Sequence, residues 1–271
     1  MNAVDAALAV AREHGLPVER AEVVRDLTNV LVHLAPAPVV ARVPLTLARL
    51  RGREWFGEEI RLATFLARAA APIAPPSDIV DPGPHERGGF HVSFWRWVDH
   101  DRERLDAAAA GRALRDLHAG LESYDGPLPT CDRLAEVRRL LATFEQTDEI
   151  AELAEFAARL EPLDGRPIHG DAHLSNVLST PDGPLWGDLE NVCRGPVEYD
   201  LACLRFRPSP DAEAAIAAYG AHDDALIEAT MPYLTLFLAA WTHVVVERTP
   251  SPEAHAEARR RVERALAYAR A

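Results

Sequence analysis

The sequence contains no lysine, so all 29 residues counted as lysine or arginine are arginines. Without lysine the Walker A pattern GxxxxGK[ST] is absent, which excludes the P-loop route to nucleotide binding. Cysteine is also scarce. Cys131, Cys193 and Cys203 are odd in number and have no CxxC spacing, so they suggest neither a disulfide framework nor a zinc site. We expect them to be small core residues.

Long apolar runs are lacking as well. No segment approaches the run of about 18 uninterrupted apolar residues that is typical of a membrane span. Residues 1–16 show a charged, alternating helix pattern rather than a signal peptide. We therefore expect a cytoplasmic protein that has no membrane partner.

Positive charge is in deficit, and the formal net charge is −13. This charge argues against binding to nucleic acid, because phosphate backbones require a basic surface. Acidic residues are frequent in the C-terminal third, and a field of this sign would attract a cationic small molecule. The alternative is an ordinary solvated acidic surface. Candidate contacts to such a substrate are Glu190, Asp223 and Asp224.

The composition otherwise indicates a globular protein. A chain of 271 residues with 48% hydrophobic residues can bury one large core or two smaller lobes. We find no internal repeat and no low-complexity linker, which favours one compact two-lobed unit. The sequence contains no indication of the oligomeric state.

The most informative segment is Pro167–Leu178, followed by the tripeptide that ends at Asp188. Asn176 lies five residues after Asp171 in this segment. A carboxylate, an amide and a second carboxylate in this order are the groups that orient a hydroxyl and hold magnesium on a nucleotide. Asp171 would accept a hydrogen bond from the hydroxyl. Because Mg²⁺ usually takes only one or two oxygen ligands from protein, Asn176 and Asp188 would suffice to hold it.

The residues between the two expected metal ligands predict a β-hairpin. Strand-forming residues at 177–180 and 185–186 flank the turn Pro181-Asp182-Gly183-Pro184. Such a hairpin would bring Asp188 back beside Asn176.

These residues resemble the HGDxHxxN loop of the aminoglycoside phosphotransferases and their relatives, which are small-molecule kinases with a protein-kinase-like fold. The resemblance implies that Asp171 orients or deprotonates the acceptor hydroxyl. It implies magnesium binding by Asn176 and Asp188. His169 and His173 would organise the loop without taking part in the chemistry.

Asp200 lies in a second segment that resembles this family. There, an Asp at the start of a helix ties down the catalytic loop, so Asp200 would be structural. The implied fold is α+β: a small antiparallel sheet with a helix in the N-terminal lobe, and a larger, mainly helical C-terminal lobe.

The N-terminal third is consistent with a small nucleotide-binding lobe. Residues 4–14 predict a helix, and residues 18–27, 29–35 and 39–43 predict three antiparallel strands. The turn containing Thr28 and Asn29 lies where the family places its loop over the phosphates. It lacks the usual glycines, but its backbone amides could still contact phosphate.

Arg42 stands where the kinase-like fold normally has a lysine against the α and β phosphates. Arginine stays charged and binds phosphate through a bidentate fork, so the role is chemically retained. Residues 53–69 predict the following helix, in which the resemblance implies that Glu59 pairs with Arg42. Glu58 is the neighbouring candidate. An exposed strand arginine is the alternative for Arg42.

An aromatic-rich strand at residues 90–98 would lead into the hinge between the lobes. In this fold adenine bonds to backbone groups just after such a strand, which here is the segment Phe94, Trp95, Arg96 and Trp97. We therefore place the N-terminal lobe at 1–93, the hinge at 94–98 and the helical lobe at 99–271, with the catalytic segment at 167–202. Further helices are predicted at 105–121, 134–144, 150–160, 212–219, 225–246 with a break or kink at Pro232, and 253–269.

The predicted activity is transfer of the γ-phosphate of ATP or GTP, with Mg²⁺, to a hydroxyl of a small molecule such as an aminoglycoside-like antibiotic or a metabolite. Two alternatives stay open. His169, Asp171 and His173 alternate along an extended segment and could bind Zn or Fe in a metallohydrolase. The missing lysine and glycines of the small lobe would suit a non-catalytic nucleotide-binding module.

Overall fold

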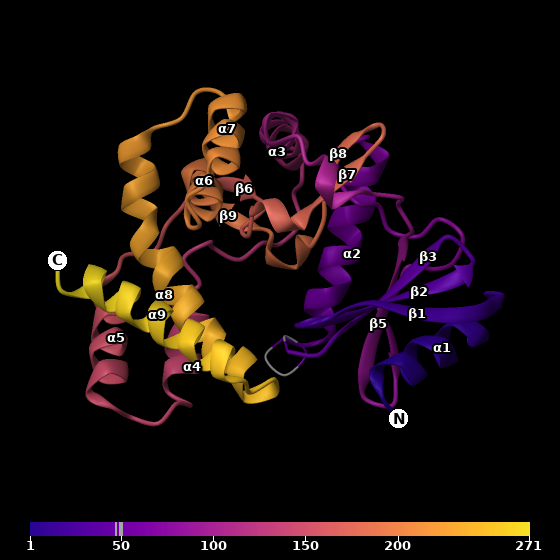
Figure 1. The fold of residues 1–271 in the computed structure, drawn as a ribbon, viewed down its shortest axis with the longest axis horizontal. Helices are drawn as coiled ribbons and strands as arrows, with labels where there is room; N and C mark the ends of the chain where they lie inside the picture. The colour runs from indigo at the N-terminus through magenta and orange to yellow at the C-terminus, as the bar shows by residue number, and fades with distance from the viewer. Residues whose placement is uncertain (47, 49–50) are drawn as a thin grey trace. The chain divides into compact units, whose positions relative to one another are not determined.

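The computed structural model describes residues 1–46, 48 and 51–271. They form two compact units, and each unit is built from two segments of the sequence. The first unit comprises Met1–Pro127 and Leu174–Glu190, and the second comprises Leu128–His173 and Asn191–Ala271. Figure 1 labels most of their helices and strands. The expected lobes at 1–93 and 99–271 follow a division by function rather than by compactness, and they stay a prediction.

The first unit opens with a helix and a five-stranded antiparallel sheet in the order β1-β2-β3-β5-β4. The helix and the first three strands confirm the expected elements at residues 4–43, and the strand expected from residue 90 is also present. The short β4 was not predicted, because three residues are too few to show a periodicity. The elements are α1 (Ala3–Glu13), β1 (Val18–Asp26), β2 (Asn29–Pro36), β3 (Val39–Pro44), β4 (His85–Arg87) and β5 (Phe90–Arg96).

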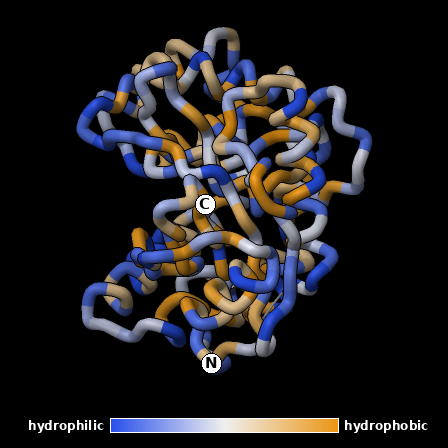
Figure 2. Tube along the Cα trace, turned by 90° about the vertical axis from the view of Figure 1, so that its right-hand side faces the viewer, coloured by the Kyte–Doolittle hydropathy of each residue, from blue (hydrophilic) through white to orange (hydrophobic). Residues whose placement is uncertain are grey.

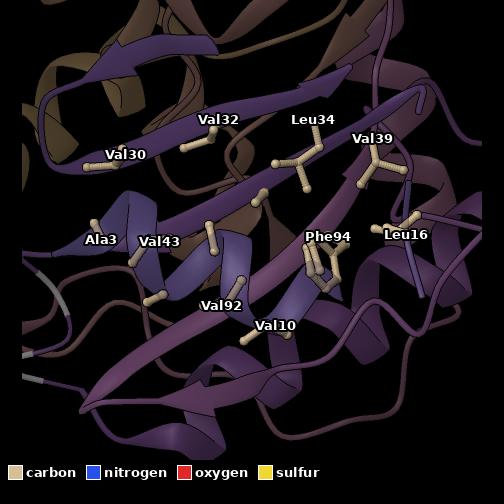
Figure 3. Close-up of a cluster of buried hydrophobic side chains, with 14 of the residues drawn as sticks. Ala3, Val10, Leu16, Val30, Val32, Leu34, Val39, Val43, Val92 and Phe94 are labelled. Atoms are coloured by element: carbon tan, nitrogen blue, oxygen red, sulfur yellow. The ribbon is translucent and has the colours of Figure 1, made fainter. Parts of the chain in front are cut away.

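Alternation along β2 directs one side of the sheet into the hydrophobic core. Val32 and Leu34 are fully buried, as expected for residues two apart on a strand. Helix α1 covers this face with small residues, including Ala7 and Val10, and Phe94 of β5 completes the cluster in Figure 3. The small side chains of α1 allow its backbone to lie close to the sheet.

The rest of the first unit supports the hairpin that was expected after Asn176. Trp186 at the end of this hairpin is fully buried, and its indole N–H donates to the carbonyl of Ala110 at 3.2 Å. The hairpin is thereby attached to helix α3. The elements are α2 (Arg53–Arg68), η2 (Arg102–Arg104), α3 (Ala107–Leu121), η3 (Leu174–Asn176), β7 (Val177–Thr180), β8 (Gly183–Trp186) and η4 (Leu189–Asn191), which ends in the second unit.

The second unit is mainly helical, as expected. Several helices begin at a side chain that accepts a backbone N–H, among them Thr147, Ser209, Asp223 and Ser251. The short strands β6 and β9 pair with each other. The elements are α4 (Leu134–Leu141), α5 (Asp148–Arg159), β6 (Arg166–Ile168), β9 (Cys193–Gly195), α6 (Val197–Arg205), α7 (Pro210–Tyr219), α8 (Asp224–Arg248) and α9 (Pro252–Ala269).

Helix α8 is continuous through Pro232, so the break that was one expectation there does not occur. Proline removes the bond to the carbonyl of Glu228, and Glu228 is exposed, where water can replace that bond. By length and composition alone α8 could also cross a membrane, although 56% of its most apolar 18-residue window is buried in the structure. It packs against α4, α6 and α9, as a core helix does.

Hydrophobic residues are concentrated inside the units, and many of the outer loops are hydrophilic (Figure 2). All three cysteines are free and buried, in agreement with their expected place in the core. Cys131 and Cys193 are fully buried, and Cys203 is nearly so.

Leu34→Ala should lower the free energy of unfolding by about 2–5 kcal/mol, because it leaves a cavity in the core beneath α1. Leu27→Ala is the matched control, since Leu27 is 56% exposed. Urea denaturation of both variants and the wild-type protein measures the difference. An equal effect of the two substitutions would contradict the assignment of Leu34 to the core.

Candidate active site

The loop that carries Asp171 begins at the end of β6 and is fixed through its backbone. The N–H groups of His169 and Gly170 donate to the two carboxylate oxygens of Asp200, both at 2.8 Å. Asp200 lies in the first turns of α6 and is fully buried. A buried carboxylate that accepts two backbone N–H groups holds both segments in one geometry. This contact is the one that the family resemblance implied for Asp200.

Gly170 and His169 adapt the loop to its surroundings. Gly170 has φ of +78°, and a Cβ at this position would overlap the carbonyl oxygen of Asn191, so only glycine fits. The fully buried His169 accepts a hydrogen bond on Nδ1 from the backbone N–H of Asp171 at 3.3 Å. Its ring is therefore used to shape the loop.

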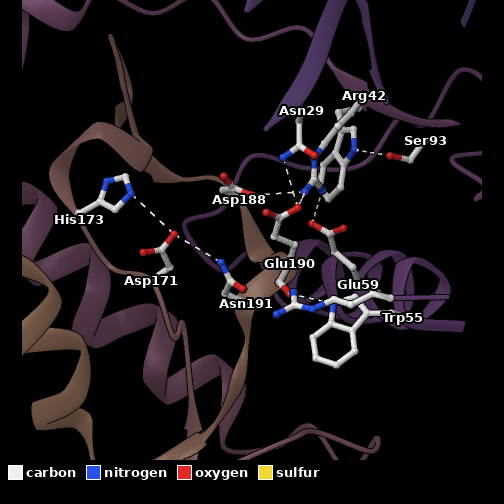
Figure 4. Close-up of polar contacts among 12 residues, drawn as sticks. Asn29, Arg42, Trp55, Glu59, Ser93, Asp171, His173, Asp188, Glu190 and Asn191 are labelled. Carbon is white, nitrogen blue, oxygen red and sulfur yellow. Dashed lines mark hydrogen bonds and ion pairs between the residues drawn. The ribbon is translucent and has the colours of Figure 1, made fainter. Parts of the chain in front are cut away.

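Asp171 is half-buried and has two polar neighbours (Figure 4). The side-chain amide of Asn191 donates to its Oδ2 at 3.4 Å. Nε2 of His173 lies 3.7 Å from the same oxygen, and the backbone N–H of His173 donates to the carbonyl of Asp171 at 2.9 Å. His173 therefore packs beside the expected base and contacts it.

Asn176 and Asp188 are brought together in the first unit by the β7–β8 hairpin. The strands pair from Val177 with Trp186 to Thr180 with Gly183, which confirms the predicted hairpin and shortens its turn to two residues. Just beyond the strands, the N–H of Gly187 donates to the carbonyl of Asn176 at 2.8 Å. Asp188 then adopts φ of +62°, a left-handed conformation that is uncommon for a residue with a side chain.

Arg42 is the centre of a buried ionic cluster in the first unit (Figure 4). Its Nη1 lies 2.5 Å from Oε1 of Glu59, and its Nη2 contacts the carboxylates of Asp188, at 3.3 Å, and Glu190. Burial by itself would lower the pKa of Arg42, but the three carboxylates raise it above its ordinary value. The guanidinium is therefore permanently charged. The exposed alternative for Arg42 does not agree with its 6% exposure.

Glu190 does not point outward as a substrate contact would. Its carboxylate is buried, pairs with Arg42 and accepts a hydrogen bond from the amide of Asn29 at 3.3 Å. Burial and the nearby charge of Asp188 raise the pKa of Glu190 to about 8, against the lowering influence of Arg42. Burial also raises the pKa of Glu59. Glu58, the other candidate partner of Arg42, instead pairs with Arg61 and Tyr124 on the same unit.

Arg51, just before α2, and Trp55, in its first turn, complete this cluster and were not found from the sequence. Trp55 Nε1 and Arg51 Nη1 both donate to the backbone carbonyl of Glu190, at 2.9 and 3.1 Å. The Arg51 guanidinium lies over the indole of Trp55, 4.0 Å from its centroid. Together they hold the backbone just after Asp188. A basic and aromatic pair at a helix start has no specific meaning in a sequence, which is why they were missed.

The phosphate turn and the adenine segment are placed as follows. The carbonyl of Thr28 accepts the N–H groups of Leu45 and Thr46 at 3.0 and 3.2 Å, so this turn is tied to the end of β3. Asn29 is buried, and its Oδ1 has no hydrogen-bond partner among the described residues.

Backbone donors in the expected adenine segment are already in use. The N–H groups of Phe94, Arg96 and Trp97 donate to the carbonyls of residues 82, 75 and 38, at 3.0, 3.0 and 2.8 Å. These three N–H groups are therefore not free to bond to adenine. Trp95 bonds to Ser93 through its indole, and Trp97 stacks on His33.

Asp223 and Asp224, the other expected substrate contacts, have local structural partners. Asp223 is the N-cap of α8 and accepts the N–H of Ala225 at 2.8 Å. Asp224 pairs with Arg205 at 2.8 Å and has a 71% exposed side chain. These contacts explain both residues without a ligand.

The alternative metal cluster finds no support in the structure. Across the described ranges, which omit positions 47, 49 and 50, no group of three or more His, Cys, Asp or Glu side chains could hold a metal ion. His169 and His173 serve the loop backbone and the Asp171 carboxylate, as described above. Asn176 and Asp188, at the two ends of the β7–β8 hairpin, have side-chain oxygens of the kind that a hard cation prefers.

Solved structures with the same fold are found among kinases of small molecules. The GDP and kanamycin complex of APH(2″)-IIIa is 14% identical over 96% of this chain and 98% of that chain, with a TM-score of 0.68. Choline kinase LicA from Streptococcus pneumoniae is 13% identical over 97% and 99%, with a TM-score of 0.69. Amicoumacin kinase hAmiN, solved with AMP-PNP, Ca²⁺ and Ami, is 14% identical over 94% and 92%, with a TM-score of 0.66. These likenesses confirm the expected α+β, protein-kinase-like fold.

The family described as the phosphotransferase enzyme family, APH, matches residues 5–236. Because this match covers most of the chain, the protein belongs to that family, as the loop around Asp171 had implied. A search of the curated proteins found no match.

Glu190→Gln should make stability less dependent on pH. The folded-state pKa of Glu190 is raised from 4.5 to about 8, so folding favours the protonated form, and the stability that this group contributes is lost as pH rises through that window. Thermal unfolding of the nucleotide-free protein between these pH values should therefore show a smaller decline for Glu190→Gln than for the wild type. The exposed Glu86→Gln is the control and should behave like the wild type. Parallel curves for all three proteins would contradict the raised pKa.

Proposed function

We propose that this protein is a small-molecule kinase that transfers the γ-phosphoryl group of ATP or GTP to a hydroxyl group. The buried Arg42–Glu59 pair, with Asp188 on the same guanidinium, is the observation that carries the proposal. A permanently charged arginine next to a metal-binding carboxylate is the arrangement that holds nucleotide phosphates. Membership of the phosphotransferase enzyme family supports the reaction type.

The second element of the proposal is Asp171 as the residue that receives the acceptor hydroxyl. Its loop is fixed by Asp200 and by the buried His169, so its carboxylate is presented on a rigid backbone. The acceptor oxygen would form a bond to the γ-phosphorus as the bond to the bridging oxygen of the nucleotide breaks. The proton of the acceptor hydroxyl would pass to Asp171 late in a loose transition state.

Mg²⁺ would be held by Asn176 and Asp188, and it would neutralise charge on the phosphate oxygens. Arg42 would contribute a fixed positive charge to the same phosphates, while Glu59 holds the guanidinium of Arg42 in place. A cation bound to Asp188 would neutralise its charge. Arg42 would then exchange its contacts with carboxylates for contacts with the phosphates. Asn29 would bring a buried amide to the phosphate turn.

We propose the acceptor class from the net charge of this chain and from the names and ligands of proteins with a similar fold. Structures of similar fold contain kanamycin and amicoumacin, and one is named a choline kinase. All would be consistent with a hydroxylated, cationic acceptor, which a chain with a net charge of −13 would attract. We propose an acceptor of this class without assigning a particular compound.

Thermal shift with ATP and GTP, each with and without Mg²⁺, tests nucleotide binding directly. We expect stabilisation, because only the folded chain has the site. It should require both nucleotide and metal, since Mg²⁺ would link the phosphates to Asn176 and Asp188. Release of ADP or GDP is then followed with a panel that includes kanamycin, choline and sugar alcohols. If nucleotide binds but no compound of a broad panel causes release of ADP or GDP, the result would favour the non-catalytic module. Stabilisation by zinc or iron alone would favour the metallohydrolase.

Asp188→Ala and Asp171→Asn should separate the two roles. Asp188→Ala should abolish metal-dependent nucleotide stabilisation and turnover, because it removes a metal ligand. Asp171→Asn should keep the stabilisation and lose turnover, since the amide cannot take the proton. Asp182→Ala and Asp182→Asn, in the exposed turn of the same hairpin, are matched controls and should resemble the wild type. Intact turnover in Asp171→Asn would overturn the role of Asp171.

A further inference from the structure

The carboxylate of Asp171 is held by a neighbour that the sequence did not single out. Nδ2 of Asn191 donates to Oδ2 of Asp171 at 3.4 Å, within the second unit (Figure 4). Asn191 is only 8% exposed. Because the donor comes from a buried side chain, it restricts rotation of the carboxylate about its Cβ–Cγ bond.

Arg133 decides which end of the Asn191 amide faces Asp171. Its Nη1 donates to Oδ1 of Asn191 and its Nη2 to the backbone carbonyl of the same residue, both at 2.6 Å. A guanidinium has only donors, so the amide oxygen must turn toward Arg133 and the NH₂ group toward Asp171. The orientation of the amide is thereby chemically determined.

Arg133 is itself held in place from several sides. It is 5% exposed, and its guanidinium carbon lies 4.8 Å from the centre of the Phe237 ring on α8. Its backbone has φ of 48°, a left-handed conformation that is unfavourable for a residue with a side chain. The preceding residue, Asp132, fixes this backbone by accepting the N–H groups of Leu134 and Leu163, at 3.0 and 2.9 Å.

We propose that Arg133 and Asn191 form a positioning pair that sets the orientation of the Asp171 carboxylate for the acceptor hydroxyl. This inference rests on the proposed function, because it assumes that Asp171 receives that hydroxyl. The pair acts through Asp171 and does not touch substrate. The strained, buried backbone of Arg133 is consistent with a position maintained for this purpose.

Asn191→Ala and Arg133→Lys should each lower kcat by about 10- to 100-fold, the effect expected of a small misplacement of a reacting group. The KM for nucleotide and the Mg²⁺-dependent thermal shift should change little. Lysine has one nitrogen and cannot make both bonds to Asn191, so Arg133→Lys frees the amide. Arg138→Lys is the matched control: it is partly buried on the adjacent helix and donates to a backbone carbonyl at 2.7 Å.

Asn191→Asp separates positioning from simple structural support. Aspartate keeps an oxygen for Arg133 and has nearly the same shape, but it places an oxygen instead of an NH₂ group against Asp171. A positioning role therefore predicts a loss of kcat at least as large as for Asn191→Ala. A merely structural role predicts that Asn191→Asp, with an unchanged melting temperature, regains the wild-type kcat. That result would overturn the proposal.

Crystal structures of the wild type and Asn191→Ala distinguish failure of this inference from failure of the proposed function. The carboxylate plane of Asp171 should be well defined in the wild type and rotated or doubly occupied in the variant. An unchanged plane overturns the positioning role, whatever the activity. If the wild type has no turnover with any acceptor, the proposed function fails, and a rotated plane would still show that the pair orients Asp171.

Discussion

The first unit depends on the burial of one charge, the guanidinium of Arg42. Desolvating an arginine is costly, and it is tolerated here because Glu59, Asp188 and Glu190 surround the same group. The carboxylates in turn depend on Arg42, because a buried carboxylate without a cation would raise its pKa and lose its charge. Strand β3, helix α2 and the segment after the β7–β8 hairpin are therefore joined by one ionic cluster.

Replacement of the usual lysine by arginine changes this cluster in a definite way. A lysine ammonium is a single charged point, whereas arginine has two terminal nitrogens in a rigid fork. Here Nη1 serves Glu59 and Nη2 serves Asp188 and Glu190. The fork thus links Glu59 on α2 to the segment that contains Asp188, and Glu190 gains a partner that its position in the sequence does not reveal. The absence of lysine from the chain is compatible with nucleotide chemistry for this reason.

Backbone hydrogen bonds, rather than ion pairs, organise the loop in the second unit. Asp200 binds consecutive N–H groups at the start of the loop, and Gly170 allows the close approach of the Asn191 carbonyl. Asp171 is then presented by a backbone with little freedom to move. Rigid presentation matters because, in phosphoryl transfer, positioning and charge neutralisation supply most of the rate enhancement.

The sequence by itself determined the α+β fold class, most helices and strands, the hairpin between Asn176 and Asp188, and the pairing of Arg42 with Glu59. The helices, strands and hairpin depend on periodicity and turn residues, which are local in the chain. The fold class and the pairing of Arg42 with Glu59 were implied by the resemblance of the loop around Asp171 to a known family. Tertiary structure alone decided the partners of Glu190, the donors Arg51 and Trp55, and the relay from Arg133 through Asn191 to Asp171. These contacts join residues up to 161 positions apart, such as Asn29 and Glu190. Their partners are selected by folding because a buried polar group must find whichever donor or acceptor the packed chain brings beside it.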